Sequence, residues 1–179
     1  PLRIGLLVDR REGLENWRLA LIDRILADDR FRLPTVLVCP PKPDTASVVF
    51  RMAESLERSA LGRQARYHPK SRQFADLPWK PYEDKVDRHH LGELDLVLAL
   101  SPLSMPLDAF SNLPFGLWRF SFLNEATAKA DWFGYQEVIA GTPATELRIE
   151  VHRAEQPRGT LATAAFNTKF SAVRNRDFI

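Results

Sequence analysis

The sequence is poor in the residues that most often build metal centres and disulfides. Its single cysteine, Cys39, has no partner within the chain, so we expect a reducing intracellular setting and a small buried side chain. No cysteines or histidines have the spacing of zinc ligands. The adjacent His89 and His90 would point in different directions on a regular element. We interpret them as solvated loop residues and predict no metal site.

Glycine is also scarce, with 8 among 179 residues. The first apolar run is followed by DRREGLENW, where Gly13 is the only glycine, so the glycine-rich loop of nucleotide-binding proteins is missing. No apolar run reaches the roughly 18 residues that cross a bilayer, and the N-terminus has no signal pattern. We therefore expect a cytoplasmic protein with no membrane partner.

The charge balance excludes a strongly basic protein. The net charge is +2, which is too small to indicate nucleic acid, and none is expected as a partner. Basic residues gather at 63–72 around Tyr67 and His68, and this cluster is either a solvated loop, which we favour, or a phosphate-binding patch. Length and composition fit one globular domain over residues 1–179. The missing initiator Met indicates part of a longer chain, whose other domains are possible partners.

Apolar periodicity predicts alternating strands and helices. Residues 3–8 and 35–39 are typical of buried parallel strands, and the helical spacing of apolar residues over 14–28 joins them into a βαβ unit. The polar stretch 62–93 is expected to be irregular, with one short strand at most. Further helices are expected at 47–60, 107–110 and 131–141, and further strands at 94–100, 115–122, 146–153 and 159–168.

This order predicts an α/β fold, Rossmann-like, with an open, mixed but mostly parallel sheet and helices on both faces. Such sheets bind ligands at the carboxyl ends of their strands, where the strand order reverses. In this sequence these ends fall at Asp9, Cys39–Pro41, Ser101–Pro106 and Phe120–Asn124. Candidate binding residues are expected there.

The C-terminal half resembles the folate-dependent formyltransferases, over about residues 94–170. The segment GYQEVIAGTPAT is similar to a bacterial branch of formyltransferase-like domains that are attached to larger chains. The resemblance rests on the following anchors: Leu94–Leu100 as the central strand, Met105-Pro106 after it, Gly116 at the start of FGLWRFSF, then Gly141, Thr145 and Gly159.

The resemblance implies a particular chemistry. Formyl transfer from 10-formyltetrahydrofolate to an amine passes through an oxyanion, which a side-chain amide and an imidazole stabilise with the help of a carboxylate. The positions of these three groups are taken here by Arg119, Ser121 and Pro157. The resemblance would also place the cofactor against four residues that follow the central strand: Ser101, Leu103, Met105 and Pro106.

None of the three substituted residues has the family chemistry. Arg119 cannot shuttle protons, Ser121 has no nearby base in sequence, and Pro157 does not ionise. Asn124 is the nearest polar residue for a relocated site, although we favour a turn-capping role for it. Glu125 and Glu155 are the neighbouring carboxylates, and an exposed loop position is favoured for Glu155.

Three hypotheses follow from these substitutions. The first, which we favour, is a catalytically degenerate formyltransferase-like domain that binds a ligand or acts as a scaffold. The second is an active formyltransferase on an amine or amino sugar, with Arg119, Ser121, Asn124 and His152 as candidate residues. The third is a module in which Arg119 binds a phosphate or carboxylate, which an unpaired Arg119 at an open pocket would support.

Overall fold

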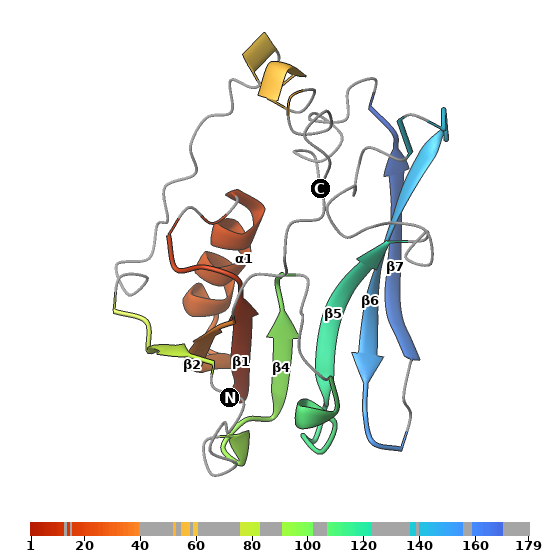
Figure 1. Cartoon of the computed structure of the whole chain (residues 1–179). Coiled ribbons are helices and arrows are strands. Elements are labelled where there is room, and N and C mark those ends of the chain that lie inside the picture. The colour runs from red at the N-terminus through yellow and green to blue at the C-terminus, as the bar shows by residue number, and fades with distance from the viewer. Residues whose placement is uncertain are drawn as a thin grey trace. The chain divides into compact units, whose positions relative to one another are not determined.

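The computed structural model describes residues 1–12, 14, 16–39, 52, 55–57, 59–60, 76–82, 91–101, 107–122, 137–138, 140–155 and 159–169 (Figure 1). The chain forms two compact units. The first comprises Pro1–Lys42, Arg66–Phe120 and Ile149–Leu161. The second comprises Pro43–Ala65, Ser121–Arg148 and Ala162–Ile179.

The strands form a seven-stranded sheet of order β3-β2-β1-β4-β5-β6-β7. Strands β1, β2, β3, β4 and β5 pair in parallel, whereas β6 runs antiparallel to β5 (Figure 1). This is the mixed, mostly parallel sheet that the sequence predicts. The strands are β1 (Leu2–Val8), β2 (Phe31–Val38), β3 (Trp79–Pro81), β4 (Leu96–Ala99), β5 (Leu117–Phe122), β6 (Ala144–His152) and β7 (Gly159–Asn167).

In the first unit, the parallel strands are buried on both faces. Leu6 and Val8 of β1 belong to one core cluster, and Leu7 between them belongs to a second. Leu98 and Val97 of β4 divide between the two clusters in the same way. Because side chains alternate along a strand, each strand contributes to both cores, which explains the continuous apolar runs in the sequence.

The helix α1 (Asn16–Ala27) lies within the predicted range 14–28 and packs against the first core cluster. Its most buried apolar residues are Ile22 and Ile25, whereas Trp17 and Leu21 are only partly buried. The buried stripe also includes Arg18, at helical spacing from Ile22. The amphipathic pattern therefore predicted the helix but not the two charged residues that it buries, Arg18 and Asp23.

Strand β2 begins at Phe31, four residues before the predicted start at Thr35. The register explains how the strand accommodates Pro34. Arg3 pairs with Arg32 and Gly5 pairs with Thr35, so β2 has one extra residue between these pairs. Proline has no N–H to donate to a ladder, and such an irregularity is one of the few places in a sheet that tolerates it.

The remaining predictions agree with the described residues. The short strand expected within 62–93 is β3, and the short helix is a 3-10 helix, η2 (Leu107–Phe110). Of the helix expected at 47–60, the described part is helical. Its apolar residues Met52 and Leu56 are exposed. Most of the helix expected at 131–141 lies outside the described residues. In the described part of the chain, no helix is long and apolar enough to cross a membrane.

Two glycines adopt a left-handed backbone at chain reversals. Gly141 (φ +64°) ends a helical turn, because its N–H donates to the Val138 carbonyl at 3.2 Å and Thr142 N–H donates to the Glu137 carbonyl at 2.8 Å. Gly116 (φ +70°) precedes β5, where an added Cβ would lie 2.2 Å from the His152 carbonyl oxygen. The backbones of β5 and β6 therefore approach too closely at Gly116 for any side chain.

We predict that Gly116→Ala destabilises the protein by several kcal/mol. Left-handed backbone alone costs a non-glycine residue about 1–2 kcal/mol, and the overlap with the His152 carbonyl adds to this. Chemical denaturation measures the free energy of unfolding. Gly141→Ala has the same backbone cost but no nearby atom, and Gly159→Ala has neither the backbone cost nor a nearby atom. The loss of stability should therefore be largest at Gly116, smaller at Gly141 and smallest at Gly159. Equal losses at 116 and 141 would contradict the close approach.

Candidate functional site

The strand order reverses between β1 and β4, which lie side by side at the centre of the sheet. From β1 the chain passes through α1 to β2 on one side, whereas β4 is followed by β5 on the other. Asp9 follows the carboxyl end of β1 and Ser101 follows that of β4. These two residues therefore stand at the position where open α/β sheets bind their ligands.

At this position the protein neutralises its own charges. Arg18 on α1 donates from Nη1 to Asp9 Oδ1 at 2.8 Å and to Ser101 Oγ at 2.9 Å. The Ser101 hydroxyl in turn donates to Asp9 Oδ1 at 2.9 Å and accepts from the Asp9 backbone N–H at 3.1 Å. Arg10 donates to the other carboxylate oxygen at 2.8 Å. A salt-bridge network thus connects β1, α1 and β4.

The central ion pair of this network is mostly buried. The side chains of Arg18 and Asp9 are 10% and 14% exposed, so neither charge is well solvated. Partial burial acts to raise the pKa of Asp9, but hydrogen bonds from Arg10 and Ser101 and the charges of Arg18 and Arg10 outweigh it and hold that pKa below its ordinary value. Asp9 is therefore a carboxylate at neutral pH and cannot act as a general acid there.

Cys39 lies at the carboxyl end of β2 and is buried. Burial, together with the negative charge of Asp9, raises the pKa of its thiol to about 11. The thiolate is the nucleophilic form of cysteine, so Cys39 is unreactive at neutral pH. This confirms the interpretation of Cys39 as a core residue.

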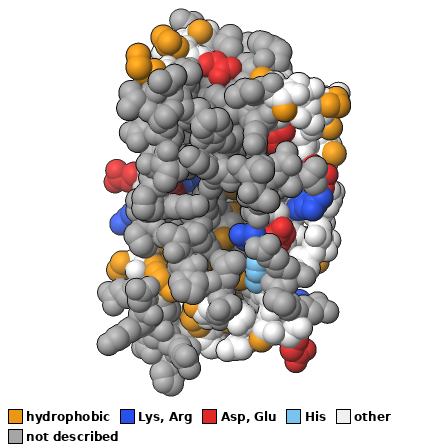
Figure 2. Space-filling model, turned by 45° about the vertical axis from the view of Figure 1, so that its right-hand side comes forward, with side chains coloured by type: hydrophobic (Ala, Val, Ile, Leu, Met, Phe, Trp, Pro, Cys, Tyr) orange, Lys and Arg blue, Asp and Glu red, His pale blue; other side chains and the backbone are white. Residues whose placement is uncertain are grey.

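Arg119 lies on β5 and forms an ion pair with Glu150 on β6. Its Nη2 and Nε donate to Glu150 Oε2 at 2.8 and 3.0 Å, and the two side chains are 20% and 16% exposed. His152 Nε2 lies 3.7 Å from the same carboxylate oxygen. Figure 2 shows acidic, basic and histidine side chains next to one another on this face. Arg119 is thus bound by an acid of the protein, which counts against the third hypothesis, in which Arg119 binds a phosphate or carboxylate.

The position of His152 along the sheet limits what this group can do. Because its carbonyl approaches Gly116, His152 lies beside the start of β5 and not beside the carboxyl end at Phe122. The imidazole–carboxylate pair is therefore away from the edge where α/β sheets bind ligands. Ser121, two residues beyond Arg119, is 1% exposed.

The aromatic residues of β5 contribute to packing. Trp118 and Phe120 pack against the core cluster that also contacts α1, and the Phe120 ring meets Trp17 edge-on with centroids 5.5 Å apart. The Trp118 indole N–H donates to the Phe115 carbonyl at 2.8 Å. These contacts assign Trp118 and Phe120 to packing between β5 and α1 and within the start of β5.

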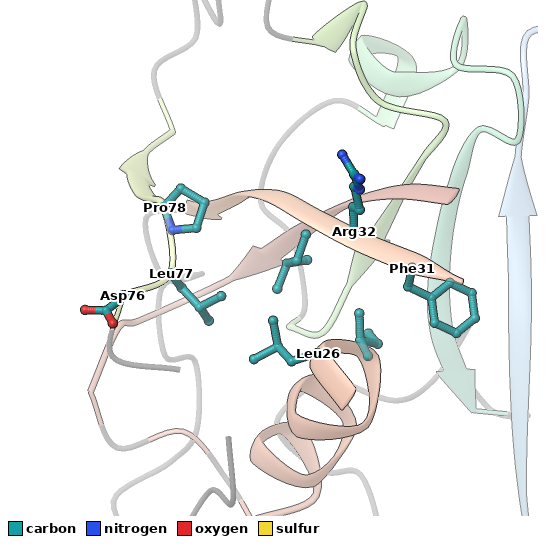
Figure 3. A pocket seen from close by; sticks show the side chains of 8 residues that line it. Leu26, Phe31, Arg32, Asp76, Leu77 and Pro78 are labelled. Atoms are coloured by element: carbon teal, nitrogen blue, oxygen red, sulfur yellow. The ribbon is translucent and has the colours of Figure 1, made fainter. Parts of the chain in front are cut away.

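A pocket of about 350 Å³ lies near the amino end of β2, at the end of the strands opposite to Asp9 (Figure 3). Phe31 and Arg32 come from β2, Leu26 comes from the end of α1, and Leu77 and Pro78 precede β3. Since β1 and β2 are parallel, this end is far along the strands from Asp9. The pocket is therefore separate from the predicted ligand edge.

Several candidate residues lie outside the described part of the chain: Asn124, Glu125, Pro157, Leu103, Met105, Pro106, His89, His90 and the cluster at 63–72. Within the described part, no three histidine, cysteine or carboxylate side chains gather as metal ligands.

The sequence analysis did not identify Arg18 as a residue of this network. The signal that could have found it is a cation inside the apolar stripe of α1, four residues after Leu14 and four before Ile22.

Comparison with known proteins identifies the architecture. Phosphoribosylglycinamide formyltransferase from Anaplasma phagocytophilum superposes with a TM-score of 0.59 at 14% identity, covering 97% of this chain and 77% of that protein. The protein has the formyltransferase fold. Glycinamide ribonucleotide transformylase 1 from Symbiobacterium toebii gives 0.56 at 14% identity, covering 99% and 80%. Formyltetrahydrofolate deformylase from Burkholderia mallei gives 0.54 at 9% identity, covering 98% and 58%. No family model and no curated protein matches the sequence.

We predict that Asp9→Asn lowers the free energy of unfolding by about 3 kcal/mol, because it leaves the buried Arg18 charge without its counter-ion. Arg10→Ala is the matched control: Arg10 also contacts Asp9, but its side chain is 60% exposed, so the loss should stay below about 1 kcal/mol. Denaturant unfolding measures both.

Asp9→Asn should also weaken the pH dependence of the free energy of unfolding under acidic conditions. The pKa of Asp9 is depressed in the folded protein, so its contribution is complete above about pH 4 and is lost as pH falls through the depressed value. Unfolding measured between about pH 2 and 5 should have a shallower pH dependence in Asp9→Asn. An unchanged pH dependence would contradict the role given to Asp9.

Proposed function

We propose that this protein is a catalytically degenerate formyltransferase-like domain that serves as a ligand-binding or scaffold module. The observation that carries the proposal is the Arg119–Glu150 ion pair. The resemblance assigns an amide to the position of Arg119, whose guanidinium is here used to neutralise Glu150. An arginine so engaged supports strand packing and cannot exchange protons with a substrate.

The neighbouring position supports the same proposal. Ser121 stands where the resemblance assigns an imidazole, and a hydroxyl does not supply a base near neutral pH. Removing a general base typically costs 10²- to 10⁴-fold in rate, and removing one oxyanion donor typically costs about 10²- to 10³-fold. The loss of both groups would lower the rate of formyl transfer by about 10⁴-fold or more.

At the edge between β1 and β4, the described polar side chains already bond to one another. Of the four residues that the resemblance assigns to the cofactor, only Ser101 is described, and its hydroxyl already bonds to Asp9 and Arg18. Ser101 therefore holds the buried charges together and does not present an unused donor or acceptor. We derive no catalytic step through the cofactor.

The alternative is an active formyltransferase on an amine or amino-sugar acceptor, with relocated catalytic residues. One observation favours it: His152 Nε2 lies 3.7 Å from a Glu150 oxygen, so an imidazole and a carboxylate are neighbours there, although farther apart than a hydrogen bond. Its place beside the start of β5 counts against this use.

The two functions are separated by turnover of 10-formyltetrahydrofolate. We predict that the protein releases tetrahydrofolate no faster than a buffer blank, with phosphoribosylglycinamide, an amino sugar or water as acceptor. A bacterial phosphoribosylglycinamide formyltransferase under identical conditions serves as the positive control.

Alanine variants of Arg119, Ser121, Asn124 and His152 identify the source of any turnover. Release well above the blank that disappears in His152→Ala or Ser121→Ala would overturn the proposal in favour of the relocated site. Release that all four variants retain would overturn it as well, and would exclude these residues as the catalytic groups.

A further inference from the structure

The two edges of the sheet differ in how they are protected against pairing. The edge strand β3 has three residues, including Lys80 and Pro81, and a lysine or proline on a short edge strand blocks the addition of another strand. The opposite edge strand, β7, has nine residues, GTLATAAFN, with no charge and no proline. Charged residues make up 27% of the chain, so a charge-free exposed strand of this length departs from its composition.

Strand β7 is exposed on both faces. The six consecutive residues from Thr160 to Ala165 are exposed, and Leu161 is 52% exposed. Because neighbouring side chains of a strand point to opposite faces, exposed side chains lie on both faces of this part of β7. A long, uncharged and exposed edge strand is a template for the addition of a further strand.

We propose that β7 pairs antiparallel with β7 of a second copy, joining the two sheets across a two-fold axis. A strand that pairs antiparallel with itself meets the same residues in both directions, so one contact satisfies both copies. With the axis at Thr163, Ala162 lies opposite Ala164 of the second copy. These side chains are small and uncharged, so no like charges oppose each other within β7.

The protected edge explains why assembly would stop at two copies. Once the two β7 strands are paired, the described strands leave the two β3 strands at the edges of the joined sheet, each with its lysine and proline. Nine residues form a ladder about 30 Å long, which buries less than the roughly 800 Å² per partner of stable complexes. The dimer is therefore expected to be weak, with a Kd in the micromolar range.

Sedimentation velocity between about 5 and 500 µM tests the dimer. The wild type should pass from the 20.5 kDa monomer to a dimer as the concentration rises, without larger species. The double variant A162K/A164K places lysines opposite lysines in registers centred near Thr163 and should raise the Kd at least tenfold. The matched control A109K/A140K makes the same change at two exposed alanines outside β7 and should dimerise like the wild type.

Charge rescue keeps the test independent of folding. A162K/A164K and A162E/A164E should each remain monomeric, and an equimolar mixture should form a mixed dimer. A monomeric wild type at the highest concentration, growth beyond the dimer, a wild-type Kd for A162K/A164K, or a mixture that stays monomeric would each overturn the proposal. None of these outcomes depends on whether formyl transfer occurs.

Discussion

The pairing of the buried Arg18 and the partly buried Arg119 with acids of the same chain is the constraint on which this structure depends. A guanidinium remains charged at any physiological pH, so an arginine removed from water requires a carboxylate close by. Arg18 meets this need through Asp9 and Arg119 through Glu150. The first pair connects α1 with the end of β1, and the second connects β5 with β6. Loss of Asp9 would leave a buried charge on Arg18, and loss of Glu150 would leave a partly buried charge on Arg119.

The two pairs also bear on function. One lies at the edge where open α/β sheets bind ligands, and the other lies at a strand position to which the resemblance assigns a catalytic group. The Asp9–Arg18–Ser101 network occupies the ends of β1 and β4, where the strand order reverses. Arg119 occupies the strand position that the resemblance assigns to a catalytic amide. In both places, polar groups that would otherwise be available to a ligand bind each other. The fold is that of the formyltransferases.

The sequence predicted most of the fold because the decisive signal is local. Continuous apolar runs such as Leu94–Leu100 mark strands buried on both faces, and helical spacing located α1 to within two residues at its start. The start of β2 was missed because Pro34 ends a regular ladder, and only the paired strand shows that the register shifts there. Partners were harder to predict. That Arg119 reaches Glu150 depends on the antiparallel register of β5 and β6, which no pattern within either strand contains.

A double-mutant cycle on Arg119 and Glu150 tests the central claim most directly, since it measures whether the cation on β5 is bound to its neighbour. We predict that Arg119→Ala and Glu150→Ala each destabilise the protein, and that together they cost less than the sum by about 1–3 kcal/mol. Such coupling would assign Arg119 to the framework of the sheet. Losses that add to within about 0.3 kcal/mol would mean that the guanidinium is free to meet a ligand, and would contradict the account.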